Sequence, residues 1–229
     1  MAGGIGSRFW PMSRTSYPKQ FIDILGTGRT LIQQTYDRLQ RIAPKENIFV
    51  VTNEDYRELV LEQCEGMDTS QVLCEPSRRN TAPCVAYASY KIKSLNANAK
   101  IVVAPADHLV LKEDKFIESI NTALDYVSKN NALLTLGIEP SRPDTGYGYI
   151  QFDSSEKDSK IKKVKTFTEK PNVELAKQFV ESGEFSWNSG MFIWTVNSII
   201  EAFKNHMPEL NGYFEDGYSK LKTDQEEQF

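Results

Sequence analysis

The stretch Met1-Ala-Gly-Gly-Ile-Gly-Ser-Arg8 opens the chain, and Pro18-Lys19-Gln20-Phe21 follows it closely. Its three glycines, Gly3, Gly4 and Gly6, fall within four positions. Glycine tolerates positive φ and lets the backbone approach a ligand because it has no Cβ, and successive backbone N–H groups in such a turn form a concave anion site. Arg8 can donate two hydrogen bonds to phosphate oxygens, and Lys19 can bring a second positive charge. The two segments therefore predict a cradle for a triphosphate.

Other glycine-rich loops fit this stretch less well. A P-loop requires G-x-x-x-x-G-K-[ST], which the sequence does not contain. A dinucleotide-binding fingerprint requires a third glycine where this chain has Phe9. A plain turn between a strand and a helix is the alternative interpretation, and the combination of Arg8 with Pro18-Lys19 favours the phosphate site over it.

Bulk composition narrows the class of protein. A chain of 229 residues is long enough for one sizeable core with a small appended lobe. The net charge of −4 argues against broad nucleic-acid binding, which normally needs a basic surface. The sequence contains neither an apolar run long enough to span a bilayer nor a secretory signal pattern at its start, so no membrane partner is expected. The three cysteines match no metal or redox spacing, which favours reduced thiols in a cytoplasmic protein.

Short apolar runs alternate with amphipathic segments along most of the chain. Strands are expected at 47–52, 72–74, 101–105, 132–138, 161–170 and 185–194, and helices at 30–42, 53–65, 83–94, 112–128, 173–181, 196–204 and after Pro208. This alternation predicts an α/β fold with right-handed crossovers and a mostly parallel central sheet flanked by helices.

Two polar segments follow predicted strands, at the sheet edge where open α/β folds bind ligands. The first, Glu75-Pro-Ser-Arg-Arg-Asn-Thr-Ala-Pro83, offers Asn80 and Thr81 as short polar groups, and its alternative interpretation is a loop with a helix cap. The second places Asp107 directly after the strand at 101–105. Because Mg²⁺ prefers hard oxygen ligands, Asp107 is a candidate metal ligand, and the alternative is a cap for the following helix.

Three further segments carry candidate groups for a polyhydroxyl ligand. In Gly146-Tyr-Gly-Tyr-Ile150 the glycines would let the backbone approach such a ligand, although a hairpin-like bend explains them too. Glu169 could accept hydrogen bonds from two hydroxyls and Lys170 could bind a phosphate, or the two could be a surface ion pair. Asn188 lies in the aromatic strand 185–194, next to Gly190, which marks a bulge or a close ligand approach.

Taken together, these segments resemble a known family. G-G-x-G-S-R-F-W-P-M-S-R-x-x-x-P-K-Q-F is similar to the signature of sugar-nucleotide pyrophosphorylases, in particular mannose-1-phosphate guanylyltransferases of the bacterial type, also called GDP-mannose pyrophosphorylases. E-P-x-x-x-N-T-A-P, P-A-D-H, T-G-Y-G-Y-I, F-x-E-K-P and W-N-S-G-M-F-x-W extend the resemblance along most of the chain. The resemblance implies a Rossmann-like, GT-A-like nucleotidyltransferase fold with Mg²⁺ as cofactor.

The resemblance also implies roles for particular residues. The catalytic residues would be Arg8, Lys19, Asp107 and Lys170, with Asp107 as the metal ligand. The nucleotide would be bound by Ala2, Gly3, Gly4, Gly6, Ser7, Glu75, Asn80, Thr81 and Ala82, and the sugar by Gly146, Tyr147, Gly148, Glu169 and Asn188.

The implied reaction joins GTP and mannose 1-phosphate. The sugar phosphate would attack the α-phosphorus of GTP in line, giving GDP-mannose and pyrophosphate. No Ser-His-Asp or Cys-His nucleophile set is recognisable, which is compatible with direct displacement. The alternatives are a uridylyl- or thymidylyltransferase acting on glucose 1-phosphate and a nucleotide-binding module without turnover. A homodimer is compatible with the resemblance.

We expect residues 1–229 to form one nucleotidyltransferase domain that is truncated at both ends. Only Met1 and Ala2 precede Gly3, where a buried strand should lead into the glycine turn. The resemblance also implies a second metal-binding Asp in a W-x-D-x-G-S-W segment, which does not occur before Phe229.

Overall fold

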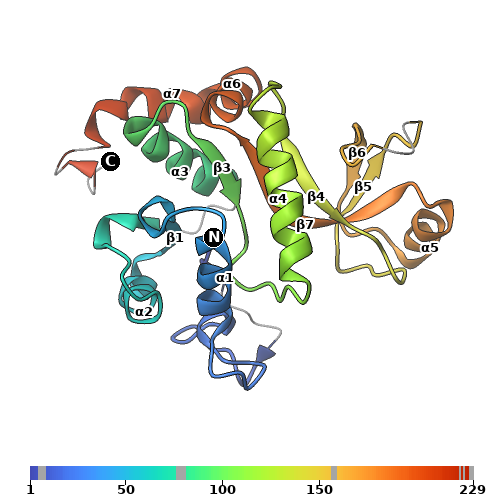
Figure 1. The fold of residues 1–229 in the computed structure, drawn as a ribbon, viewed down its shortest axis with the longest axis horizontal. Helices are drawn as coiled ribbons and strands as arrows, with labels where there is room; N and C mark the ends of the chain where they lie inside the picture. The colour runs from blue at the N-terminus through green and yellow to red at the C-terminus, as the bar shows by residue number, and fades with distance from the viewer. Residues whose placement is uncertain (5–8, 76–80, 156–158, 222, 224, 227–229) are drawn as a thin grey trace. The chain divides into compact units, whose positions relative to one another are not determined.

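The computed structural model describes residues 1–4, 9–75, 81–155, 159–221, 223, 225 and 226, and Figure 1 traces the chain by colour from its first residue to its last. Its contacts divide the chain into two compact units. Unit 1 comprises Met1–Leu133 and Trp194–Phe229, and unit 2 comprises Leu134–Ile193.

Unit 1 contains the alternating helices and strands predicted for the first half of the chain. Its elements are α1 (Leu31–Gln40), β1 (Val50–Asn53), α2 (Arg57–Gln63), β2 (Val72–Glu75), α3 (Thr81–Leu95), β3 (Lys100–Val103), α4 (Glu113–Val127), α6 (Val196–His206) and α7 (Pro208–Asp216). β1 and β2 pair in parallel, with Val50 opposite Val72. α3 packs against α6 and α7 (Figure 1), where the buried Tyr90 donates a hydrogen bond of 2.7 Å to Asn211.

α1 shows how the sequence defines a helix here. Thr30 caps it, and the side chain of Gln33 accepts a hydrogen bond from the Thr30 N–H in return, which completes a capping box. The apolar face carries Ile32 and Tyr36, which are buried in a core with Phe21 and other residues. The expected helix and its cap are confirmed.

Residues 1 and 2 form hydrogen bonds with two strand regions of unit 1. The amide of Ala2 donates to the carbonyl of Val51 at 2.8 Å, the N–H of Ala106 donates to Met1 O at 3.0 Å, and the nitrogen of Met1 donates to Ala104 O at 2.9 Å. The bonding pattern is the one expected of a strand that leads into the opening turn between β1 and the end of β3.

A mostly apolar cavity of about 740 Å³ lies among α1, β1, α3, β3 and α4.

Unit 2 is built around an antiparallel sheet. Its elements are β4 (Leu134–Ile138), β5 (Tyr149–Phe152), β6 (Val164–Thr168), α5 (Val173–Ser182) and β7 (Phe185–Thr195), of which the last two residues belong to unit 1. β7 pairs antiparallel with β4 and with β5, and β5 pairs antiparallel with β6. α5 packs its Ala176 and Phe179 against Tyr149. It ends at Gly183, whose φ is 68°.

The α/β fold class is confirmed, but parallel pairing holds for β1 and β2 and does not extend to unit 2. The connection from β5 to β6 contains no helix among its described residues. A connection of this kind can join antiparallel strands, whereas parallel strands need a longer crossover, so β5 and β6 pair antiparallel. Several boundaries differ from the prediction by a few residues, two of them because a 3₁₀ turn stands where the element was expected to begin. The helix expected at 53–65 begins as a 3₁₀ turn, Glu54–Tyr56, and the strand expected from residue 47 begins at Val50 because Lys45–Asn47 forms another 3₁₀ turn after Pro44.

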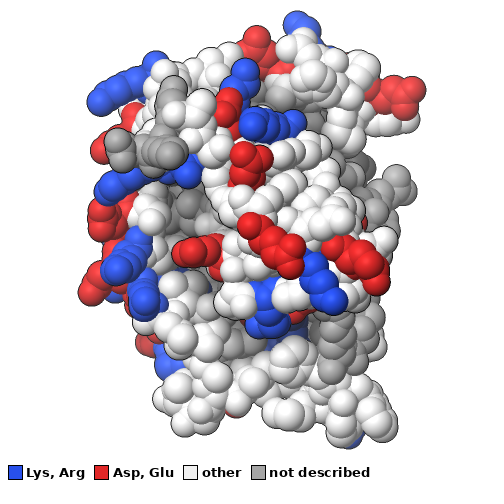
Figure 2. Space-filling view, turned by 90° about the vertical axis from the view of Figure 1, so that its right-hand side faces the viewer, with Lys and Arg blue, Asp and Glu red and all other residues white. Residues whose placement is uncertain are grey.

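The surface carries charges of both signs. On the face viewed in Figure 2, Lys and Arg side chains lie among Asp and Glu side chains, and the described residues there do not gather into one basic patch. None of the helices that the structure describes is long and apolar enough to cross a membrane.

Candidate functional site

The opening turn leaves open space above its backbone. A Cβ on Gly3 or Gly4 would meet no atom within 4 Å, and neither glycine has a left-handed φ. The conformational freedom of glycine therefore does not explain these two positions. An approaching ligand would use this space, which agrees with the predicted cradle. Gly6, Ser7 and Arg8 lie outside the described residues.

Gln20 holds this turn from its buried side. Its side chain is in the 3₁₀ helix Lys19–Phe21, is 2% exposed, and donates from Nε2 to the carbonyls of Ala2 at 2.7 Å and Gly4 at 3.0 Å. These two bonds fix the direction of the turn's carbonyl groups. No role is predicted for Gln20 from the sequence. The available sequence signal was the polar Gln20 directly before an aromatic residue, Phe21, which the structure shows to be fully buried.

Lys19 and Asp107 form an ion pair although they are far apart in the sequence. The Nζ atom of Lys19 lies 2.7 Å from Oδ2 of Asp107, and both side chains are about a quarter exposed, at 25% and 26%. Asp107 lies in the loop between β3 and α4. The interpretation of Asp107 as a helix cap is wrong, because α4 has Lys112 at its N-cap position and no side-chain cap. The pair is reachable from solvent and combines a cation with a hard oxygen ligand.

The imidazole of His108 lies next to this pair. Its Nε2 atom is 3.9 Å from Oδ1 of Asp107. Burial lowers the pKa of His108, the positive charges of Lys19 and Arg38 lower it further, and Asp107 opposes them. The imidazole therefore takes up a proton less readily than an ordinary histidine.

The predicted base-recognition loop is described only at its two ends. Glu75 is the last residue of β2, and burial raises the pKa of its carboxyl group. Thr81 and Ala82 begin α3, while Asn80 lies outside the described residues. Because β1 and β2 run parallel and Ala2 bonds to β1, Glu75 ends its strand at the edge where the opening turn begins.

In unit 2, three predicted sugar-binding residues converge. The N–H of Asn188 in β7 donates to the carbonyl of Gly148 at 2.8 Å. A Cβ on Gly148 would lie 2.6 Å from Oε2 of Glu169, which follows β6, and 3.6 Å from Cβ of Asn188. A Cβ at this position would displace the carboxylate of Glu169. The carboxylate of Glu169 and the Cβ of Asn188 thus lie next to the same glycine, and carboxylate and amide groups suit the recognition of hydroxyl groups.

The backbone at Lys170 is unusual. Its φ of 44° is the one left-handed value among the non-glycine residues that the structure describes. Such values cluster at active sites and ligand-binding segments. The Nζ atom lies 3.5 Å from Oε1 of Glu169, and the two side chains are 58% and 70% exposed. The cation therefore stands beside the predicted sugar-binding carboxylate and faces solvent.

An aromatic and cationic group borders these residues within unit 2. The ring of Tyr147, which follows Gly146, lies 4.9 Å from that of Trp187, and the guanidinium of Arg142 lies 5.4 Å from the same Trp187 ring. Asp144 holds Arg142 at 2.7 Å and accepts a hydrogen bond from the Gly146 N–H at 2.8 Å. The sequence analysis assigned no role to Arg142 because it lies in a loop without a distinctive pattern.

The described residues contain no cluster of three or more His, Cys, Asp or Glu side chains that could enclose a metal. A carboxylate that binds Mg²⁺ with the help of substrate phosphates needs no such cluster. Asp107 is placed for that arrangement, next to Lys19 and in the loop that follows β3.

Comparison with known proteins identifies relatives along almost the whole chain. The family described as "Nucleotidyl transferase" matches residues 1–228. A mannose-1-phosphate guanylyltransferase of Salmonella montevideo is 42% identical over 211 residues, covering 89% of this chain and 44% of the relative. Another mannose-1-phosphate guanylyltransferase, from Escherichia coli strain K12, is 38% identical over 98% of this chain and 48% of its own length. The chain thus spans less than half the length of these curated relatives.

A solved structure supports the same relationship. The crystal structure of a Thermus thermophilus protein, described as a mannose-1-phosphate geranyltransferase, matches with a TM-score of 0.88 and 30% identity, over 99% of this chain and 64% of that one. The family match over residues 1–228 and these similarities show that the chain belongs to the nucleotidyl transferase family.

Proposed function

We propose that this chain transfers the guanylyl group of GTP to mannose 1-phosphate, giving GDP-mannose and pyrophosphate. The ion pair between Lys19 and Asp107, in the same unit as the open glycine turn, is the observation that carries the proposal. The names of the relatives support the choice of substrates.

The reaction makes one bond and breaks one bond. A phosphate oxygen of mannose 1-phosphate attacks the α-phosphorus of GTP, and the bond from that phosphorus to the oxygen bridging to the β-phosphate breaks, releasing pyrophosphate. The nucleophile is already an anion, so the protein must align the reactants and screen their charges. Lys19 and Arg8 would bind the β- and γ-phosphates and stabilise the negative charge that develops on the leaving group.

Asp107 would hold Mg²⁺. The fit rests on its partly exposed carboxylate and on the open space over Gly3 and Gly4, where a Cβ would meet no atom. When bound there, Mg²⁺ would supply positive charge that offsets part of the negative charge of the phosphate groups.

The residues of unit 2 would bind the sugar phosphate. Glu169 and Asn188 would hydrogen-bond to the sugar hydroxyls, and Gly148 lets the Glu169 carboxylate lie close to the backbone beside Asn188. Lys170 would offset the repulsion between the two anionic substrates. Its left-handed backbone and exposed ammonium group support this role.

The test is a pair of measurements on the purified chain. Pyrophosphate release is followed with GTP and mannose 1-phosphate, and GTP binding is measured by calorimetry in competition with UTP and dTTP. We expect pyrophosphate release that Asp107→Asn abolishes, and GTP binding that the other nucleotides do not displace. Preference for UTP or dTTP would overturn the guanylyl assignment, and tight GTP binding without turnover would indicate a binding module. A homodimer and a cytoplasmic location remain predictions, and analytical ultracentrifugation and cell fractionation would test them.

A further inference from the structure

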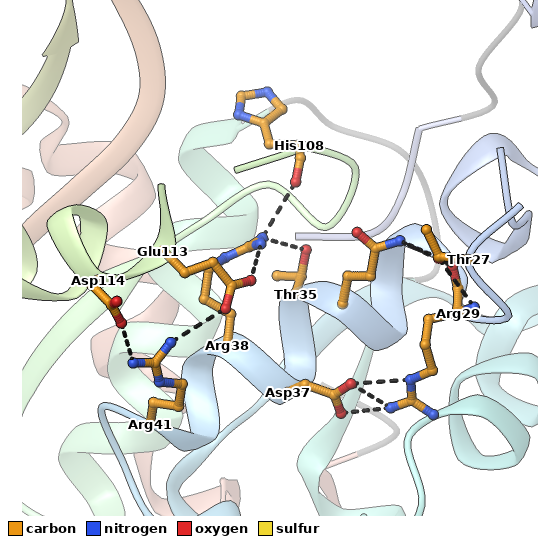
Figure 3. Close-up of polar contacts among 10 residues, drawn as sticks. Thr27, Arg29, Thr35, Asp37, Arg38, Arg41, His108, Glu113 and Asp114 are labelled. Atoms are coloured by element: carbon orange, nitrogen blue, oxygen red, sulfur yellow. Dashed lines mark hydrogen bonds and ion pairs between the residues drawn. The ribbon is translucent and has the colours of Figure 1, made fainter. Parts of the chain in front are cut away.

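Arg38 is a buried cation in the last turn of α1. Its side chain is 2% exposed, and Figure 3 shows its guanidinium pointing toward the loop before α4. Nη2 donates to Oγ1 of Thr35 at 3.1 Å and to the carbonyl of His108 at 3.3 Å, and Nη1 lies 3.4 Å from Oε1 of Glu113. The guanidinium carbon is also 5.6 Å from the ring centroid of Phe116. One side chain of α1 therefore contacts both the loop after β3 and the start of α4.

Packing alone gives no reason for this residue. A buried ion pair can often be replaced by apolar side chains without loss of stability, because desolvation offsets the attraction. Here the carboxylate partner is 39% exposed, so it compensates the buried charge only in part. Burial lowers the pKa of Arg38, and Glu113 opposes that effect. A group that is costly to bury suggests a role beyond packing.

The backbone around Asp107 indicates that role. On one side of Asp107, the N–H of Ala106 donates to Met1 O at 3.0 Å. On the other side, the carbonyl of His108 accepts from Arg38 at 3.3 Å. The two residues that flank Asp107 are thus held through their backbones from two different parts of unit 1. We infer that Arg38 is a positioning residue, which orients the carboxylate of Asp107 through the His108 carbonyl. The inference rests on the proposed function of Asp107.

The guanidinium group suits this task better than an ammonium group. It offers several N–H donors in a fixed plane and can contact a hydroxyl, a carbonyl and a carboxylate at once. Arg41 is a natural comparison at the end of the same helix. Figure 3 shows it beside the same Glu113, which it contacts at 3.3 Å, while it also contacts Asp114 at 2.6 Å, and its side chain is 47% exposed.

The test compares Arg38→Gln with Arg41→Gln. Both substitutions remove a cation that contacts Glu113, but only the first removes the hydrogen bond to His108. Metal binding in the presence of GTP is titrated with Mn²⁺ and followed by electron paramagnetic resonance, and folding is checked by circular dichroism. We expect Arg38→Gln to need about tenfold more Mn²⁺ for half-saturation, because residues that orient a metal ligand affect metal affinity by about that factor. Arg41→Gln should titrate like the unmodified chain.

Asp107→Asn separates the two possible failures. If Asp107→Asn binds Mn²⁺ as tightly as the unmodified chain, the proposed metal ligand is wrong. If Asp107→Asn loses metal but Arg38→Gln does not, only the positioning role is overturned. If Arg38→Gln does not fold, Arg38→Lys replaces it, because it keeps the charge and loses the guanidinium plane. The same tenfold shift is expected of Arg38→Lys, and normal metal affinity in that variant would overturn the inference.

Discussion

Replacing Gly148 by alanine should weaken binding of the sugar phosphate while leaving the fold intact. The added Cβ would lie 2.6 Å from Oε2 of Glu169, and ordinary contact begins at 3.4 Å, so the carboxylate must retreat by about 0.8 Å. That oxygen is at the far end of a side chain that is 70% exposed, so it can move at little cost to folding. The displacement would nevertheless break its hydrogen bond to a sugar hydroxyl.

A hydrogen bond to a charged group contributes about 2 kcal/mol, so its loss corresponds to roughly 30-fold weaker binding. Calorimetric titration of the Gly148→Ala chain with mannose 1-phosphate, with GTP as the second ligand, measures this effect. We expect the dissociation constant for mannose 1-phosphate to rise by about that factor, and the affinity for GTP to stay unchanged.

Gly137→Ala is the matched control for this prediction. Its Cβ would lie 2.7 Å from Cβ of Ser186, an atom fixed to the backbone of a neighbouring strand, so the clash cannot be relieved by a side-chain rotation. This control should lower the melting temperature, whereas Gly148→Ala should not. Unchanged binding of mannose 1-phosphate in Gly148→Ala would refute the assignment of Glu169 and Gly148 to the sugar site.

Three further outcomes are expected. Lys19→Ala should lower the turnover rate by about a hundredfold or more and change the affinity for GTP much less, because the charge of Lys19 is needed most as the leaving group forms. Steady-state kinetics measures the turnover rate and calorimetry measures the affinity. Equal losses in both would mean that Lys19 only binds the nucleotide. Gln20→Glu should weaken GTP binding and lower the melting temperature, since it replaces a donor to two carbonyls by an acceptor. Both defects should lessen at acidic pH, where the new carboxyl group is protonated and can donate again. Burial raises the pKa of Cys64 to about 12 and that of Cys84 to about 11, so at pH 8 only about one in ten thousand and one in a thousand of these thiols are ionised. Mass spectrometry after iodoacetamide treatment should show both unlabelled in the native chain and labelled after denaturation.

Local pattern sufficed for much of the fold. The capping box at Thr30 and the left-handed Gly183 are short-range signals, and the helices that they begin or end lie where the sequence predicts them. Lys19 and Asp107 also meet, as expected of two residues predicted to serve one phosphate site: Lys19 begins the 3₁₀ helix Lys19–Phe21, and Asp107 lies in the loop after β3. Functional residues at the carboxyl ends of strands can therefore be predicted from the sequence when the strands are assigned correctly.

The residues that the sequence analysis missed have a different character. Gln20 reaches back to Ala2 and Gly4, and Arg38 reaches forward to His108, 70 positions away. A buried polar side chain leaves no periodic signal that points to its partner, so neither contact follows from spacing. The positive φ of Lys170 is likewise invisible, because a lysine gives no local hint of a left-handed backbone.

Exposure separates the residues expected to touch substrate from those that hold them. Lys19 and Asp107 are each about a quarter exposed and Glu169 is 70% exposed, whereas Gln20 and Arg38 are each 2% exposed. Each buried side chain donates to backbone carbonyls of a segment that carries candidate ligand groups. A substitution at an exposed position removes a group that would itself contact substrate or metal. A substitution at a buried donor leaves every reacting group present but releases its backbone, so it should appear first as weaker binding of nucleotide or metal.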